Sequence, residues 1–101
     1  MAREVVWSFQ ADSDLESIAD FIAKDSPFYA ASFVREIRDV SRTLNQFSVR
    51  GHIVPEIAQS NIREIVIGKY RLIYSIEKSR VVILALIHGA RDLSGLLKKR
   101  E

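Results

Sequence analysis

Two polar side chains interrupt the most apolar part of the sequence. Between Lys69 and Leu93, a segment rich in Val, Ile, Leu and Tyr, Arg71 lies in the first half and His88 closes the second. Histidine exchanges protons near neutral pH, and the planar guanidinium of arginine fits a phosphate or a carboxylate. The pair is therefore compatible with satisfied core residues, with part of a binding face, or with a catalytic pair.

Three strands are predicted in the second half of the chain, and they decide which side chains share a face. They cover residues 62–67, 70–76 and 81–88, which are rich in β-branched and aromatic residues. Gly68-Lys69 suits a two-residue type II′ turn, and Lys78-Ser79 gives a weaker turn signal. Both turns predict antiparallel pairing of consecutive strands.

The register that follows brings a carboxylate toward Arg71 and His88. Val66 is expected opposite Arg71, and Leu86 is expected opposite Arg71 on its other side, with His88 as the diagonal neighbour. Cross-strand neighbours lie about 5 Å apart and diagonal ones about 7–8 Å apart. Glu64, Arg71 and His88 are therefore predicted to reach one another on a single surface of the sheet.

The two faces of this sheet differ in what would cover them. One face is almost wholly apolar and is expected under the helices, with Ile65, Ile67, Tyr70, Leu72, Tyr74, Ile76, Val81, Ile83, Ala85 and Ile87. The face of Arg71 is expected to be open, and proteins rarely leave a large apolar patch bare. A partner is therefore predicted to cover its apolar residues, Val66, Ile73, Val82, Leu84 and Leu86.

The first half of the chain predicts one strand and two helices. A β-branched and aromatic run covers residues 3–8, and Asp12 is expected to open a helix with apolar residues at helical spacing. Asp25-Ser26-Pro27 ends it, with Ser26 as the predicted cap of the second helix. The element order β-α-α-β-β-β predicts an α+β fold, with a helical hairpin packed on one face of a mostly antiparallel sheet.

Length and charge indicate one small domain. The 101 residues suffice for a single core, expected over residues 1–93, followed by a short basic tail over residues 94–101. The net charge is +2, but residues 1–50 hold six basic and eight acidic residues, whereas residues 51–101 hold nine and five. Such asymmetry can orient a protein toward a phosphate backbone or an acidic partner.

Several function classes are excluded by what the sequence lacks. There is no cysteine, no metal-ligand spacing and no glycine-rich phosphate loop, so no metal and no cofactor are predicted. The start, M-A-R-E-V-V-W-S, is unlike a signal peptide, and the longest apolar run, Val81–Ile87, is too short to cross a bilayer. A cytoplasmic protein without membrane contact is expected.

Several stretches together resemble one protein family. I-R-E-I-V-I-G-K-Y-R-L-I-Y-S-I, followed by V-V-I-L-A-L-I-H-G-A-R-D-L, is similar to the toxins of RelE/ParE-type type II toxin–antitoxin modules. The N-terminal V-V-W-S, D-L-E-S-I-A-D-F-I-A and D-S-P agree, as does V-P-E at residues 54–56. The similarity extends over residues 3–93 and is greatest to the ParE, or plasmid-stabilisation, branch.

The resemblance implies a growth-inhibitory toxin that a cognate, ParD-like antitoxin neutralises, as a homodimer or a toxin–antitoxin hetero-oligomer. ParE-like toxins act on DNA gyrase, and this is the activity expected here. RelE-like relatives are endoribonucleases that cut messenger RNA on the ribosome, which is the alternative. A non-toxic interaction module is the third interpretation.

Each interpretation assigns the candidate residues differently. For a nuclease, Glu64 would be the general base, His88 the general acid and Arg71 the phosphate ligand; otherwise Glu64 and Arg71 form an ion pair and His88 ends the strand. No aromatic residue follows Tyr74, which is unlike RelE-type sites. For a gyrase inhibitor, Arg71 and Arg91 are the expected target contacts, and the antitoxin is expected on Val66, Ile73, Val82, Leu84 and Leu86.

Overall fold

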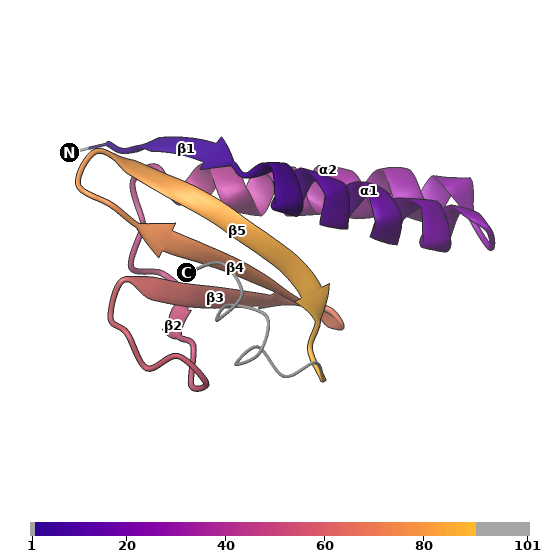
Figure 1. Ribbon diagram of the computed structural model, residues 1–101. Helices are drawn as coiled ribbons and strands as arrows, with labels where there is room; N and C mark the ends of the chain where they lie inside the picture. The colour runs from indigo at the N-terminus through magenta and orange to yellow at the C-terminus, as the bar shows by residue number, and fades with distance from the viewer. Residues whose placement is uncertain (1, 91–101) are drawn as a thin grey trace.

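The computed structural model describes residues 2–90 and confirms the α+β architecture. Its elements follow the order β-α-α-β-β-β-β along the chain. They are β1 Glu4–Trp7, α1 Phe9–Ala23, α2 Pro27–Thr43, β2 His52–Ile53, β3 Ile62–Ile67, β4 Tyr70–Ile76 and β5 Arg80–His88. The strands form one sheet in the order β1-β5-β4-β3-β2 (Figure 1).

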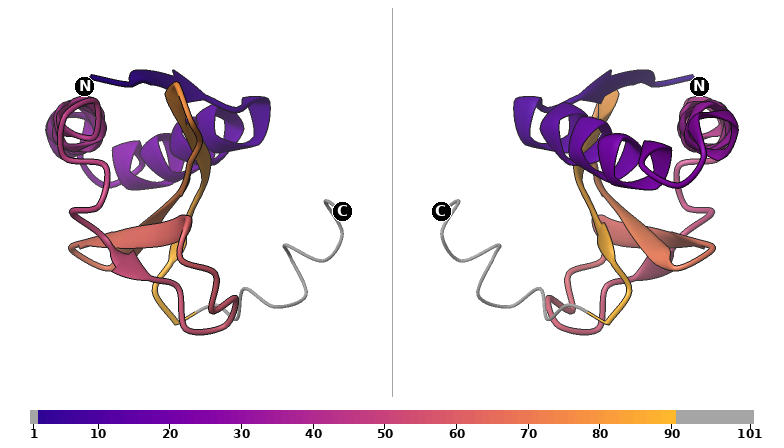
Figure 2. Two further views of the ribbon diagram at one scale, coloured as in Figure 1. Left: turned by 90° about the vertical axis from the view of Figure 1, so that its left-hand side faces the viewer. Right: turned by 90° about the vertical axis from the view of Figure 1, so that its right-hand side faces the viewer.

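Only the outermost pairing of β1 with β5 is parallel, and all other neighbouring strands are antiparallel. The two helices lie side by side next to β1 and β5, whereas β2 and β3 lie further from them (Figure 1). The loop that joins β2 to β3 lies on the side of the sheet away from the helices (Figure 2).

Helix starts follow from local capping. Ser26 caps α2, as predicted, because its hydroxyl accepts the amide N–H of Tyr29 at 3.1 Å and Pro27 begins the helix. The prediction that α1 opens at Asp12 is wrong by one turn. Ser8 is its cap and accepts the N–H of Ala11 at 3.0 Å, so the helix starts at Phe9.

The predicted register is correct for β3 and β4 but fails in β5. Val66 lies opposite Arg71, as expected from the Gly68-Lys69 turn, where Gly68 has a φ of 59°. Between β4 and β5, Ile73 pairs with Ala85 and Tyr74 with Ile83, so Leu84 is an extra, bulged residue. A bulge of one residue moves every later side chain of β5 to the other face.

Residues of α1 and its cap stabilise this bulge. The Ser8 hydroxyl donates to the carbonyl of Leu84 at 3.2 Å, and the Asp14 carboxylate accepts the N–H of Leu86 at 3.0 Å. These side chains satisfy two backbone groups that β1 cannot reach, since its pairing with β5 ends at Ile83.

Two apolar cores result, one on each face of the sheet. The larger core joins the sheet to the helices and includes Leu15, Ile37, Leu72, Tyr74 and Leu86. The smaller core lies on the other face, where Val54 and Ile57 of the β2–β3 loop pack against Ile73, Ala85 and Ile87. The chain thus covers most of the face that was expected to be open.

Candidate functional site

Arg71 is the centre of a buried ion-pair cluster on the second face of the sheet. Its side chain extends from β4 and is 9% exposed. Nη1 and Nη2 donate to the two carboxylate oxygens of Glu56 at 2.9 Å each, and Nε donates to Glu64 Oε1 at 2.7 Å. Bidentate hydrogen bonds between arginine and a carboxylate are among the strongest hydrogen bonds in proteins. The sequence predicted the contact of Glu64 with Arg71 but not that of Glu56.

The electrostatics of the cluster keep Arg71 charged and paired with Glu56 and Glu64. The hydrogen bonds that Arg71 donates to Glu56 raise the pKa of Arg71, burial acts in the opposite direction, and Glu64 raises the pKa further. Two carboxylates and one guanidinium leave a net charge of −1. A phosphate that approached Arg71 would therefore have to displace Glu56 or Glu64.

Glu56 belongs to a strap, which we define as residues 54–59, across the second face of the sheet. Val54 is fully buried, and its N–H donates to the carbonyl of Ile62 at 3.2 Å. Ala58 adopts a left-handed backbone conformation with a φ of 56°. A β-carbon makes this conformation costly, so the surrounding contacts must hold it. The bidentate pair of Glu56 with Arg71 is one of those contacts.

A shallow groove of about 490 Å³ lies beside the cluster. Arg71, Glu56 and Glu64 line it together with the exposed Val66 and Lys69. Among residues 2–90, no group of three or more His, Cys, Asp or Glu residues could hold a metal ion. The groove offers charged and apolar contacts to a ligand. Within it, Glu56 and Glu64 already bind the guanidinium of Arg71.

His88 does not join Glu64 and Arg71, and the prediction of one shared surface is wrong. Because of the bulge, Ile87 lies opposite Arg71, and His88 lies opposite Tyr70, whose ring packs on the helix side. The His88 and Tyr70 rings are 5.8 Å apart, and His88 Nδ1 accepts the N–H of Ala90 at 3.2 Å. The sheet separates the histidine from the two charged groups.

The five residues expected to bind an antitoxin are also divided by the bulge. Ile73 is fully buried under the strap, and Leu86 is 2% exposed in the helix-side core, so neither can form an open face. Val82 and Leu84 are half-buried, whereas Val66 is 61% exposed. The premise of a bare apolar sheet face is thus wrong. Arg91 and residues 94–101 lie outside the described residues.

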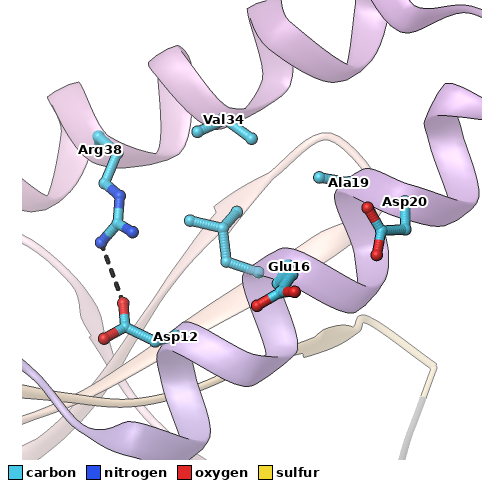
Figure 3. A pocket seen from close by; sticks show the side chains of 7 residues that line it. Asp12, Glu16, Ala19, Asp20, Val34 and Arg38 are labelled. Carbon is cyan, nitrogen blue, oxygen red and sulfur yellow. Dashed lines mark hydrogen bonds and ion pairs between the residues drawn. The ribbon is translucent and has the colours of Figure 1, made fainter.

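A second groove, of about 470 Å³, separates the two helices on their outer side. Asp12, Glu16 and Asp20 follow one another along α1 at four-residue spacing and so share one face (Figure 3). From α2, Arg38 reaches across to Asp12 at 3.3 Å (Figure 3). The groove has apolar residues between these charges, namely Leu15, Ala19 and Val34.

Glu56 and the helix groove are the features that the sequence did not reveal. The V-P-E stretch at residues 54–56 is present in the sequence, but no local pattern indicates that Glu56 contacts the distant Arg71. The four-residue spacing of Asp12, Glu16 and Asp20 can be seen in the sequence. That these residues line a groove beside α2 depends on how the helical hairpin packs. None of the helices within residues 2–90 is long and apolar enough to span a membrane.

The geometry defines a small α+β domain, and its similarity to known proteins assigns it to a family. Residues 5–93 match the family of ParE toxins of type II toxin–antitoxin systems, parDE, and the chain belongs to this family. The resemblance noted in the sequence is thereby confirmed. The chain is a type II toxin, and this membership implies a cognate antitoxin as its partner.

Two relatives illustrate the similarity. The chain is 29% identical over 89 residues to Toxin RelE2 of Caulobacter vibrioides, covering 87% of this chain and 97% of the relative. It also resembles a chain of the chromosomal ParDE TA system from P. aeruginosa, with a TM-score of 0.71 at 19% identity, covering 86% and 96% of the two chains. The latter likeness concerns the fold.

Proposed function

We propose that this toxin inhibits growth by binding DNA gyrase in the cytoplasm, and that its antitoxin prevents this binding. The observation that carries the proposal is the separation of His88 from Glu64 and Arg71 by the sheet. A ribonuclease of the alternative type needs an acid and a base on either side of one phosphate. A binding inhibitor needs neither.

The ion-pair cluster gives further support to inhibition by binding. A general base must lie about 2.6–3.2 Å from the atom that carries the proton it removes. Glu64 is 13% exposed, already accepts the Nε–H of Arg71 and forms an ion pair with Nη2 of the same side chain. Arg71 in turn is held by Glu56. Neither residue is poised for RNA without prior rearrangement of the cluster.

His88→Ala is expected to leave toxicity and gyrase inhibition close to those of the wild type, because no proton transfer depends on the ring. Loss of a general acid would instead reduce the rate about 10²–10⁴-fold. The measurements are DNA supercoiling by purified gyrase and cleavage of ribosome-bound message. Message cleavage by the wild type that His88→Ala abolishes would contradict the proposal and favour the nuclease.

We further propose the helix groove as an antitoxin-binding surface, in place of the sheet face. Its acidic stripe, Asp12, Glu16 and Asp20, and its apolar floor suit a helix that carries an apolar stripe flanked by lysine or arginine. The groove is open at the surface, and Leu15 at its floor is shared with the helix-side core, so a partner can enter it without unfolding the toxin. Val66 can extend this surface only if the antitoxin wraps around the sheet.

Glu16→Lys is expected to weaken antitoxin binding at least about tenfold, since like charges across an interface are strongly unfavourable. Glu36→Lys makes the same charge change on α2, outside the residues that line the groove, and serves as the control. Affinities are measured by titration calorimetry. Equal effects of the two variants would place the antitoxin elsewhere.

A further inference from the structure

Arginines without carboxylate partners gather at one end of the sheet. Within the described residues, the arginines at 38, 42, 71 and 80 form ion pairs. Arg3, Arg35, Arg50 and Arg63 do not. Arg35 is exposed on α2, whereas the side chains of Arg3, Arg50 and Arg63 reach only neutral oxygens of the described chain. We name these three residues the arginine patch.

All three arginines of the patch meet at the loop of residues 48–51. Arg3 Nη1 donates to the Ser48 hydroxyl at 3.0 Å, and Arg63 Nη1 donates to the carbonyl of Gly51 at 3.0 Å. Arg50 belongs to the loop itself and donates to Thr43, the last residue of α2, at 2.9 Å. Hydrogen bonds to neutral oxygens fix these guanidinium groups without cancelling their charge.

The loop that carries the patch is rigidly built. The Tyr74 hydroxyl is buried, donates to the carbonyl of Ser48 at 2.7 Å and accepts the N–H of Gly51 at 2.9 Å. A β-carbon on Gly51 would lie 2.5 Å from the carbonyl oxygen of Glu64, so the backbones pack as closely as glycine allows. The patch is thus held in place before any ligand arrives.

Few acidic residues lie in the chain around the patch. The exceptions are Glu4, which follows Arg3, and Glu64, which follows Arg63 and accepts from Arg71. Residues 40–55 and 57–63 contain no aspartate or glutamate, and Glu56 between them is held by Arg71 on the second face of the sheet. Near Arg3, the side chain of Glu77 pairs with Arg80, while its carbonyl accepts from Arg3. The patch therefore keeps an excess of positive charge.

Exposed apolar and neutral polar groups accompany this charge. Phe47 directly precedes this loop and is 63% exposed, Val49 within the loop is 66% exposed, and His52 follows it as an exposed residue. Arginines interspersed with an exposed aromatic ring and neutral polar residues are typical of surfaces that bind a nucleic-acid backbone.

We propose that the arginine patch binds the phosphodiester backbone of nucleic acid. The contact is directed to phosphates, which carry no sequence information, so it does not depend on base sequence. This inference goes beyond the proposed inhibition of gyrase, since it is a property of the toxin alone and is measurable without that enzyme.

The test measures binding of the purified full chain to a fluorescent 20-base-pair duplex DNA and to a single-stranded RNA of equal length, over a series of salt concentrations. Each phosphate contact contributes about −0.9 to the slope of log affinity against log salt for duplex DNA. Arg50→Gln is therefore expected to make that slope less negative by about 0.9 and to weaken binding equally for unrelated sequences.

Arg35→Gln is the matched control, because Arg35 is exposed on α2 outside the patch and the charge change is identical. It is expected to keep the wild-type slope. Arg50→Lys is expected to keep most of the binding, which separates charge from folding. Binding to both probes supports the phosphate contact. A preference for one probe identifies whether DNA or RNA is the nucleic acid that the patch binds. No salt-dependent binding, or equal loss in Arg35→Gln and Arg50→Gln, would overturn the proposal.

Discussion

A Leu86→Lys variant is expected to lose most of its folding stability. Leu86 is 2% exposed and lies in the core between the sheet and the helices. Removing a buried leucine side chain sacrifices about 1.5–3 kcal/mol of apolar burial, and an unpaired ammonium in the same place costs several kcal/mol more. Domains of this size are stable by only about 5–15 kcal/mol. The measurement is the urea midpoint by circular dichroism.

Val66→Lys is the control for this experiment. Val66 is 61% exposed on the second face, so lysine there is expected to change stability by no more than about 0.5 kcal/mol. The contrast tests the bulge at Leu84 directly, because a strand without it would place Leu86 on the same face as Val66. Equal tolerance of both substitutions would show that the register of β5 is regular.

The bulge also explains which part of the sheet could be predicted from the sequence. The register of β3 against β4 follows from a two-residue turn, which is a local signal carried by Gly68 and Lys69. The register of β5 depends on Ser8 and Asp14, more than 70 residues away along the chain. Nothing within β5 itself marks Leu84 as an extra residue. A prediction from the regular alternation of side chains therefore assigns Leu86 and His88 to the wrong face of the sheet.

The candidate site shows the same division between local and distant information. The pair of Glu64 with Arg71 was predictable, because the residues lie on neighbouring strands joined by a tight turn. The pair of Glu56 with Arg71 was not, since the strap is an irregular loop whose path depends on how Val54 packs under the sheet. The expectation of an uncovered face failed for this reason.

Arg71→Ala is expected to destabilise the domain by about 3–5 kcal/mol, the usual result of removing one partner from a buried ion pair. Glu56 and Glu64 would remain close together without their shared guanidinium, and the strap would lose its bidentate contact. Hydrogen exchange should accelerate first at Ile57 and Ala58, whose N–H groups donate to the Val54 carbonyl. Unchanged exchange in the strap would contradict this role of Arg71.

Stability and target binding by Arg71 can be separated by neutralising the whole cluster. Replacing Arg71 by Met together with Glu56→Gln and Glu64→Gln removes the arginine without leaving an unpaired charge, and such replacements are often neutral for stability. If Arg71 mainly holds the strap, this triple variant should regain both stability and toxicity relative to Arg71→Ala. If Arg71 contacts the target, stability should return while growth inhibition stays lost. Toxicity measured beside the urea midpoint therefore distinguishes a structural arginine from a target contact.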